Sequence, residues 1–525
     1  MADYVFGANI LENLTTGMYQ DSRVIYREYI QNACDQIDVA CKLGLLASKK
    51  DGYINIQING DNRTITIADN ATGIARDKFR ETLANIADSD KHVGEAKGFR
   101  GIGRLCGLAY CRKVIFTSKY KGENQISIMV CDAQKMRELI TQNGRGLKHT
   151  ASDVLSQIYS FSEKEYHQAI DEHWFRVELI GVNQENHDLL DFQKVKDYLS
   201  FVAPVPYQNK FLFRKKVYDH AETLGQQIDE YNIRLNGEDI FKKYGTRFKT
   251  SKGDDEVFDV EFKDFYDSHG NLIAWMWVGL SRFKAIIEKD CPMRGIRLRK
   301  ENIQIGNEDA LQKLFREDRG NHYFIGEVFA VSHDLIPNSQ RDYFNENHAR
   351  FEFELALRNY FNDELHRIYY EGSAINSAFS KIDASQLKVA EHQQKVINGD
   401  YVDDTQRERA EQAVENACQD AEKAKRDLER KRTNAANNPG NVIGRIITRI
   451  QNERAQTEHE PQIEETPEKQ AEHDPKQKNG YRTDKLSQYS KRERKLISRI
   501  FSIILSATDE KSAEKIIAKI EDELQ

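Results

Sequence analysis

The most informative segment of the chain is Arg27-Glu28-Tyr29-Ile30-Gln31-Asn32-Ala33-Cys34-Asp35. It lies in a stretch with helical periodicity from Ser22 to Ala40, so Glu28, Asn32 and Asp35 share one helical face. An amide oxygen suits a metal ion that also binds phosphates, and a carboxylate one turn away can accept a proton from water. Taken alone, the same spacing fits an ordinary solvated polar face, so its meaning depends on the motifs that follow.

A second motif ends the expected strand Thr64–Ala68, where the chain continues Asp69-Asn70-Ala71-Thr72-Gly73. A carboxylate at a strand end can accept the exocyclic amino group of adenine, which the carbonyl of guanine could not supply. Gly73 would allow the backbone to approach the base. A simple turn would use the same residue types.

A third motif is the turn Gly98-Phe99-Arg100-Gly101-Ile102-Gly103, which precedes an expected helix over Leu105–Cys111. Glycines at this spacing before a helix form a cradle of backbone N–H groups for phosphates. A Rossmann fingerprint has similar glycines but lies in the first βα turn, whereas this turn comes after roughly a hundred residues and two other motifs.

In this order and spacing the three motifs resemble the GHKL ATPase superfamily, which contains gyrase, the ninety-kilodalton heat-shock chaperone, histidine kinases and MutL. The likeness is strongest to the chaperone, over Tyr19–Asp35 and at Ile86–Lys91. The resemblance implies the cofactors ATP and Mg²⁺, with Glu28 as general base and Asn32 as metal ligand. It also implies nucleotide binding by Asp35, Asp69, Gly73, Ser89, Lys91, Gly98, Gly101, Ile102 and Gly103.

Two positions depart from the family pattern. Ala71 stands where the family has the first glycine of a D-x-G-x-G turn. The closing strand, His173–Leu179, lacks the Gly-Thr pair that normally precedes it. In the family that threonine helps to bind a water at the adenine site, so one adenine contact is in question here.

A later segment, Gly295–Asn302 and Gly326–Asp342, resembles the transducer domain that follows GHKL pockets. In the chaperone an arginine in the loop after the last strand reaches the γ-phosphate, and Arg341 occupies the matching position. The fixed charge and planar fork of an arginine suit this role in phosphoryl transfer. The alternative is a surface ion pair of Arg341 with Asp342 or Glu346.

The predicted fold class is α+β, with a Bergerat-type α/β sandwich at residues 1–190. A transducer-like α/β domain is expected at 191–375, and a coiled-coil hairpin at 376–433 turns at Asn398-Gly399-Asp400. Its expected seam includes Leu387, Ile397, Ala421 and Ala424. Polar composition predicts a disordered linker at 434–482, before amphipathic helices at 483–525.

Composition excludes several classes of protein. The chain has 525 residues, too many for one core, and its formal net charge of −7 does not indicate nucleic acid as the main partner. It has no apolar run that could span a membrane and no secretory signal pattern. Its seven cysteines include no C-x-x-C pair, so reduced thiols and a cytoplasmic location are expected, without a zinc site.

The favoured function is therefore an ATP-hydrolysing conformational machine that acts as a homodimeric clamp on a protein client. The alternative is a DNA-associated clamp of the MutL or MORC kind. The basic cluster Lys491, Arg492, Arg494, Lys495 and Arg499 favours that alternative, although a solvated helix face would have the same charges. A sensor histidine kinase is not expected, because that family places a phosphoacceptor helix before the ATP domain, whereas here the Glu28 motif begins within thirty residues of Met1.

Overall fold

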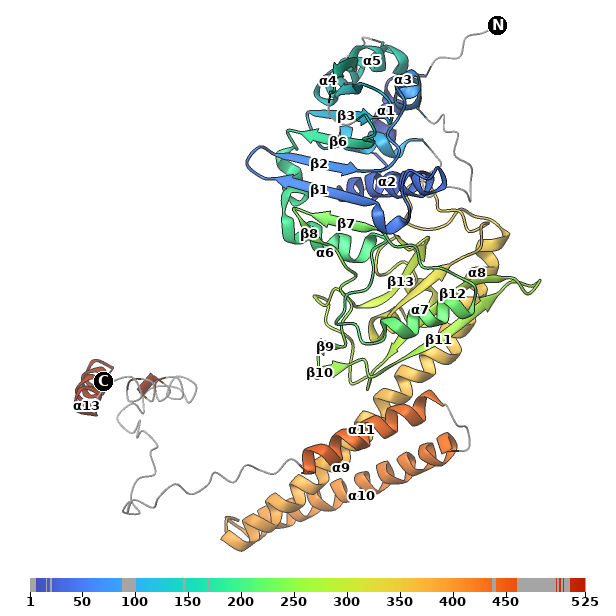
Figure 1. Ribbon diagram of the computed structural model, residues 1–525. Helices are drawn as coiled ribbons and strands as arrows, with labels where there is room; N and C mark the ends of the chain where they lie inside the picture. Colours follow the sequence, from blue (N-terminus) through green and yellow to red (C-terminus); the bar gives the residue numbers. More distant parts are fainter. Residues whose placement is uncertain are drawn as a thin grey trace. The chain divides into compact units, whose positions relative to one another are not determined.

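The structure is a computed structural model that describes residues 6–15, 17–18, 21–86, 101–144, 148–167, 170–436, 441–459, 497, 500–501, 504 and 510–524 (Figure 1). It divides into two compact units, residues 1–455 and 456–525. The units are described separately below. Among the described residues, no helix is long and apolar enough to cross a membrane.

The first unit begins with an eight-stranded mixed sheet in the order β5-β4-β3-β6-β2-β1-β7-β8. All of its neighbouring strands are antiparallel except β1 and β7. The strands are β1 (Tyr53–Asn59), β2 (Thr64–Asp69), β3 (Lys113–Lys119), β4 (Gln125–Asp132), β5 (Tyr159–Glu165), β6 (Trp174–Ile180), β7 (Asn232–Leu235) and β8 (Glu238–Asp239). Alternate residues such as Ile65 and Ile67 face the core, which the period-2 pattern predicted.

Helices pack against this sheet and build the first core. They are α1 (Asn9–Leu14), α2 (Val24–Lys42), α3 (Arg76–Ala84), α4 (Ala133–Gly144), α5 (Ala151–Ile158) and α6 (Phe192–Val202), with 3₁₀ turns at Lys49–Asp51, Gly103–Ala109 (η2) and Gln184–Leu190. Helix α2 confirms the predicted helix and contacts β2, η2 and α6. The sandwich expected from the sequence is therefore confirmed, with α2 lying along the sheet (Figure 1).

The expected domain boundary at residue 190 is wrong, because β7 and β8 complete the first sheet. Ile233 and Leu235 lie opposite Ile54 and Ile56 in a parallel pairing, and all four are buried. The first hydrophobic core therefore extends to Ile240. Such a pairing joins segments far apart in sequence, so local patterns place the strand but not its partner.

A second sheet of five strands has the order β11-β12-β15-β13-β14, with β13 and β15 parallel. Its strands are β11 (Asp259–Tyr266), β12 (Leu272–Leu280), β13 (Gly295–Lys300), β14 (Ile303–Ile305) and β15 (Ile325–Ala330). A separate pair is β9 (Arg247–Thr250) and β10 (Gly253–Glu256). The helices here are α7 (Arg214–Thr223) and α8 (His348–Tyr360), with 3₁₀ turns at Gln312–Leu314 and Asp318–Tyr323 and a π-helical segment at Phe361–Leu365 directly after α8. Strand β12 separates two cores, with Trp275 and Trp277 on one face and Met276 and Val278 on the other.

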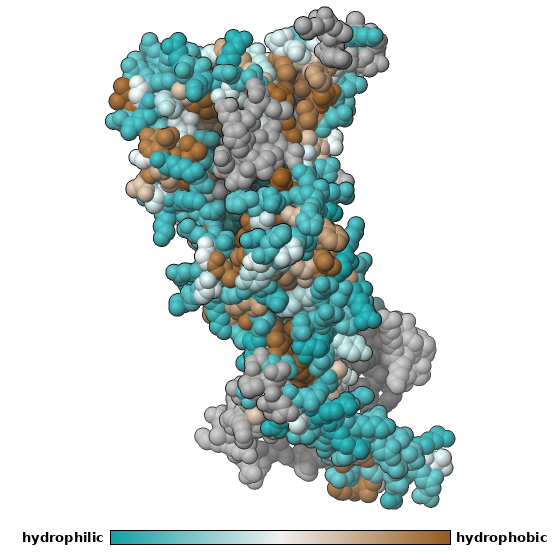
Figure 2. Space-filling model, turned by 90° about the vertical axis from the view of Figure 1, so that its right-hand side faces the viewer, coloured by the Kyte–Doolittle hydropathy of each residue, from teal (hydrophilic) through white to brown (hydrophobic). Residues whose placement is uncertain are grey.

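Two long helices follow, α9 (His366–Asn398) and α10 (Asp404–Ala436), and they pack on each other. The predicted turn is present, with Gly399 in the left-handed conformation at φ 68°. Ala421 and Ala424 are buried in the contact as expected, but Leu387 and Ile397 are 62% and 82% exposed, so the predicted seam on α9 is wrong. Val396, Ile397 and Val402 flank the turn at Gly399 and form an exposed apolar tip, and an apolar patch is visible at the lower end of Figure 2.

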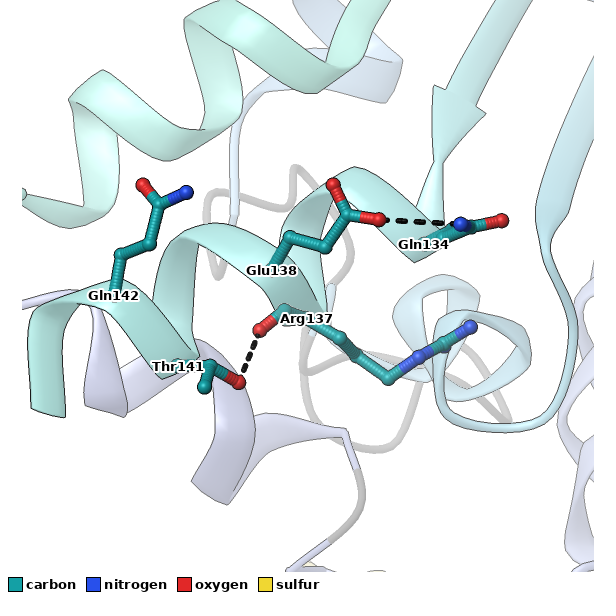
Figure 3. A pocket seen from close by; sticks show the side chains of 5 residues that line it. All are labelled: Gln134, Arg137, Glu138, Thr141 and Gln142. Atoms are coloured by element: carbon teal, nitrogen blue, oxygen red, sulfur yellow. Dashed lines mark hydrogen bonds between the residues drawn. The ribbon is translucent and has the colours of Figure 1, made fainter. Parts of the chain in front are cut away.

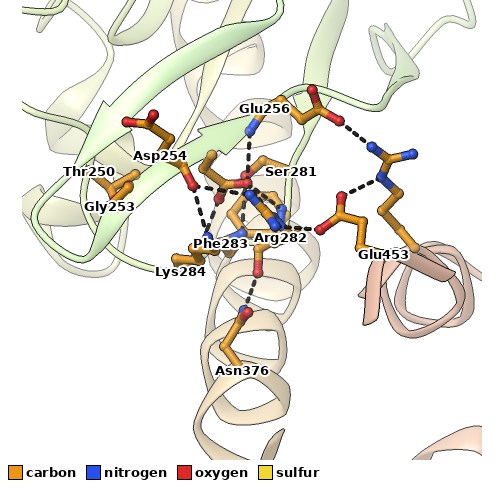
Figure 4. Close-up of polar contacts among 12 residues, drawn as sticks. Thr250, Gly253, Asp254, Glu256, Ser281, Arg282, Phe283, Lys284, Asn376 and Glu453 are labelled. Atoms are coloured by element: carbon orange, nitrogen blue, oxygen red, sulfur yellow. Dashed lines mark hydrogen bonds and ion pairs between the residues drawn. The ribbon is translucent and has the colours of Figure 1, made fainter. Parts of the chain in front are cut away.

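Part of the expected disordered linker is instead a helix, α11 (Val442–His459). Its Ile443, Ile446, Ile447 and Ile450 are buried in the core of the second sheet. Acidic residues of that domain pair with its arginines, and its Glu453 pairs with Arg282 next to Asn376 (Figure 4). The prediction was wrong because it used the polar composition of the whole segment and not the helical spacing of its four isoleucines. Residues 460–482 lie outside the described residues.

The second unit contains α13 (Glu510–Glu523), which confirms the later of the two predicted terminal helices. Ile517 is buried with Phe501, and Ile497, Ile504, Ile520 and Leu524 pack against them. Part of the apolar stripe predicted from the sequence is therefore covered within this unit, whereas Ile500 and Ile516 of the same stripe are exposed. The basic cluster at residues 491–499, apart from position 497, lies outside the described residues.

Candidate functional site

Helix α2 presents the first three predicted site residues. Glu28 and Asp35 are buried at 8% and 5% exposure, and Asn32 is half-buried. Two buried carboxylates on a helix that also carries Ile25, Tyr26, Tyr29 and Ile30 are not a solvated polar face. The arrangement therefore favours the functional interpretation of the motif over the surface one.

The end of the glycine-rich turn lies directly against Glu28. A Cβ atom on Gly103 would lie 2.5 Å from the Glu28 Oε2 atom, so a side chain here would displace this carboxylate from its present position. The Tyr29 hydroxyl donates to the Arg104 carbonyl at 3.0 Å and fixes the turn to α2. Gly101 has φ of 68°, and Ile102 precedes η2. The predicted α-helix over 105–111 is instead the 3₁₀ helix Gly103–Ala109.

Asp69 ends β2 and is only 5% exposed. Its Oδ1 atom accepts the Ala71 N–H at 3.0 Å, and among the described residues no donor reaches Oδ2. Burial raises the pKa of this carboxyl to about 7, and the Ala71 N–H opposes the rise only in part. One carboxyl oxygen is therefore available to a ligand that donates a hydrogen bond.

The loop after Asp69 is held close to the sheet. Gly73 has φ of 64°, and a Cβ there would lie 2.1 Å from the Lys119 carbonyl. Ser118 Oγ accepts the Ile74 N–H at 2.7 Å and donates to the Ile74 carbonyl at 3.1 Å. Thr72 Oγ1 donates to Gln36 Oε1 at 2.8 Å, which joins this loop to α2. The Asp69 loop and the Glu28 helix thus form one site.

The two departures from the family pattern have a structural explanation. Ala71 is fully buried, and its carbonyl lies 2.6 Å from His173 Nδ1, so the turn is held without the missing glycine. Phe175 of β6 lies opposite Asp69 in the strand register, and it has no hydroxyl group. The sequence pointed to neither Ser118 nor His173, because each contacts a loop far away along the chain.

Arg341 reaches the site from the second sheet. It lies in the loop between Pro337 and Phe344, which form a β-bridge, and it adopts φ of 55°, uncommon for a residue with a side chain. Its Nε atom lies 3.9 Å from Glu28 Oε1. Arg27 lies 3.4 Å from the same oxygen and donates to the Gln340 carbonyl at 3.1 Å, so α2 holds this loop.

A cavity of about 700 Å³ lies beside this junction, between α2, α6 and the second sheet. Seven basic side chains line it against four acidic ones, so it favours anions; the basic residues are Arg23, Arg27, Lys194, Lys289, Arg294, Arg297 and Arg341. A pocket of about 350 Å³ on α4 contains none of the predicted site residues (Figure 3). Its Arg137 donates to the carbonyls of Leu108 and Cys111 and supports the end of η2.

Three predicted nucleotide-binding residues, Ser89, Lys91 and Gly98, lie outside the described residues. Within the described part of the chain, no group of three or more His, Cys, Asp or Glu side chains could hold a metal ion. That result is compatible with a magnesium ion bound by Asn32, because Mg²⁺ commonly takes few protein ligands and is completed by phosphates and water. Magnesium binding therefore stays a prediction.

Comparison with known proteins agrees with the resemblance to GHKL ATPases seen in the sequence. A family model described as histidine kinase-, DNA gyrase B- and HSP90-like ATPase matches residues 26–158, which include Glu28, Asp69 and Gly103 but not Arg341. The N-terminal domain belongs to the GHKL superfamily. Its glycine turn, Asp69 loop and α2 are thus parts of one GHKL domain.

The relatives of this GHKL protein include bacterial chaperones. "Chaperone protein HtpG" of Bacillus licheniformis is 35% identical over 131 residues, 22% of this chain and 21% of the relative. The protein of the same name from Francisella tularensis subsp. tularensis is 24% identical over 294 residues, 51% of this chain and 40% of the relative. The chain spans less than half the length of these relatives.

The raised pKa of Asp69 makes the stability of the GHKL domain depend on pH. The folded protein takes up this proton more readily than the unfolded chain, whose Asp pKa is about 3.9. The stabilisation is complete below that value and is lost as pH rises through about 7. The quantity to compare is the unfolding free energy of wild type minus that of Asp69→Asn. We expect this difference to be about 2 kcal/mol larger at pH 5.5 than at pH 8.

Urea denaturation of the nucleotide-free protein at both pH values measures this difference, and the Asn variant controls for all other titrating groups. Parallel pH dependence in the two proteins would contradict the burial of a protonated Asp69.

Proposed function

We propose that this protein binds ATP with Mg²⁺ and hydrolyses it to ADP and phosphate. The observation that carries the proposal is the meeting of Glu28, Gly103 and Arg341, which come from three distant parts of the chain. A buried carboxylate flanked by a glycine turn and two guanidinium groups has the parts that phosphoryl transfer to water requires. The match to GHKL ATPases supports the same assignment.

The residues present fit an adenine nucleotide. Asp69 has a free acceptor oxygen at the end of β2, and Gly73 lets the loop beside it pack closely against the Lys119 carbonyl of β3. In the proposal Asp69 accepts the adenine amino group, Gly101, Ile102 and Gly103 face the phosphates, and Asn32 and Asp35 face them from α2. Asn32 would hold Mg²⁺, which neutralises phosphate charge when it is bound.

Catalysis would then depend on two side chains. Glu28 orients the attacking water and accepts its proton, while Arg341 stabilises the charge that develops on the transferred phosphoryl group. Arg27 contributes by holding the Arg341 loop through the Gln340 carbonyl. Ser89, Lys91 and Gly98 are assigned to the phosphates by resemblance alone.

At the level of the whole protein we propose a chaperone-like machine that works as a homodimer on a protein client. The named relatives are chaperones, and the exposed tip of the α9–α10 hairpin offers an apolar surface. The basic cluster that motivates a DNA-associated clamp lies almost wholly outside the described residues, so that alternative keeps only its sequence basis. Light scattering with and without a non-hydrolysable ATP analogue tests the dimer, and monomers in both conditions would exclude it.

Two variants test the catalytic assignment. Glu28→Ala should keep its affinity for ATP while its turnover falls on the order of 10²–10⁴-fold, because a general base acts only in the chemical step. Arg341→Ala should lower turnover at least about tenfold with little change in affinity, since its main contribution comes in the transition state.

Phosphate release and equilibrium ATP binding, measured on the same preparations, give these values, with the exposed Arg358→Ala as a matched control from the same domain. Absence of turnover in wild type would refute the ATPase. Normal turnover in Glu28→Ala would show that this carboxylate is not the base.

A further inference from the structure

A buried network of charged and polar groups lies in the second sheet, behind the Arg341 loop. At its centre is the fully buried carboxylate of Glu327 on β15. Five side chains donate to it: Arg299, Lys242, Tyr207, Tyr244 and Trp277. Burial alone would raise the pKa of Glu327, but the charges of Arg299 and Lys242 prevail and lower it to about 2. Glu327 is therefore ionised and bonded by five donors, an arrangement that can specify one geometry, while burial lowers the pKa of Lys242 to about 7.

The network continues into the GHKL domain. Arg299 Nη2 donates to the Phe201 carbonyl in α6 at 2.7 Å. Lys242 Nζ donates to Asn302 Oδ1 at 2.6 Å, and Asn302 Nδ2 donates to the Asp229 carbonyl at 2.5 Å.

The Asp229 side chain in turn pairs with Lys49 at 2.7 Å, and Lys49 pairs with Asp38 of α2 at 2.9 Å. A chain of polar contacts thus connects Asn302 to the helix that carries Glu28.

Asn302 also determines the path of the backbone. It adopts φ of 60° and the preceding Glu301 φ of 53°, so the two residues form the tight turn between β13 and β14. Asn is among the few residues with a side chain that enter this region readily. Asn302 is 2% exposed. Its two side-chain bonds therefore fix the start of β14 inside the protein.

Strand β14 transmits that position to Arg341. It has only three residues, Ile303, Gln304 and Ile305, and all three are buried. The next residue, Gly306, donates its N–H to the Arg341 carbonyl at 2.8 Å, and a Cβ there would lie 2.5 Å from the Asp342 carbonyl. Because β14 is at the edge of its sheet, only β13 holds it by strand pairing. The anchor at Asn302 is thus needed to place it.

We propose that Asn302 is a positioning residue for Arg341, which it holds toward Glu28 through β14 by bonding Lys242 and the Asp229 carbonyl. The inference rests on the proposed ATPase function. In this proposal Asn302 does not contact the nucleotide. It determines how close the Arg341 side chain lies to Glu28. Misplacement of a catalytic group by about 1 Å can cost on the order of 10²-fold in rate.

The variant Asn302→Gly removes both side-chain bonds and keeps a residue that accepts positive φ. We expect its kcat to fall on the order of tenfold to a hundredfold while its ATP affinity stays within about twofold. Glu301→Gly is the matched control, since it changes the same turn and leaves the Asn302 bonds in place. Asn302→Asp, which keeps an acceptor for Lys242 and loses the donor to Asp229, serves if the Gly variant does not fold.

A double-mutant cycle separates positioning from general destabilisation. In the Arg341→Ala background, Asn302→Gly should lower kcat by less than about twofold, because the group it positions is already absent. An equal loss in both backgrounds, or normal kcat in Asn302→Gly and Asn302→Asp, would overturn the proposal. Failure of the proposed function is distinguishable, since wild type would then show no ATP turnover.

Discussion

Arg341 and Glu28 belong to different sheets, and the candidate site depends on keeping them together. An ion pair near 4 Å contributes little in water, but here both side chains are about nine-tenths buried. The attraction between Arg341 and Glu28 is therefore stronger than in water only while the contact between the two domains keeps both side chains buried. Two features close it: Arg27 bonds the Arg341 loop to α2, and the Glu327 network bonds the second sheet to α6. The position of Arg341 relative to Glu28 thus depends on the contacts between the two domains.

Two buried carboxylates, Asp69 and Glu327, have pKa values shifted in opposite directions. The difference distinguishes a carboxylate that is available to a ligand from one that only stabilises the structure. Asp69 meets burial and one backbone N–H, so its pKa rises to about 7 and one oxygen is left for a ligand. Glu327 is equally enclosed, but Arg299 and Lys242 lower its pKa to about 2 and five donors surround it. A satisfied buried carboxylate fixes structure, whereas an unsatisfied one is available for binding.

The sequence predicted those parts of the fold and site that depend on local pattern. Period-2 alternation located β2, and helical spacing placed Glu28, Asn32 and Asp35 on α2. Contacts across the chain were not predictable in this way: β7 joins β1 in the first sheet, and Ser118 holds the loop at Ile74. Helix α11 was missed because its arginines made the segment look solvated, although those arginines pair with acids of the second domain. Leu387 and Ile397 had seam spacing, yet the hairpin packs on another face of α9.

Equilibrium binding of ATP and GTP to the full chain in the presence of Mg²⁺ tests the central claim most directly. In the proposed site the amino group of adenine would donate to Asp69, whereas guanine would present a carbonyl to the buried carboxyl. An adenine site at Asp69 predicts measurable ATP binding, with GTP weaker by at least about tenfold, the loss expected for one charge-assisted hydrogen bond. Equal affinity for the two nucleotides, or no binding of ATP, would contradict it.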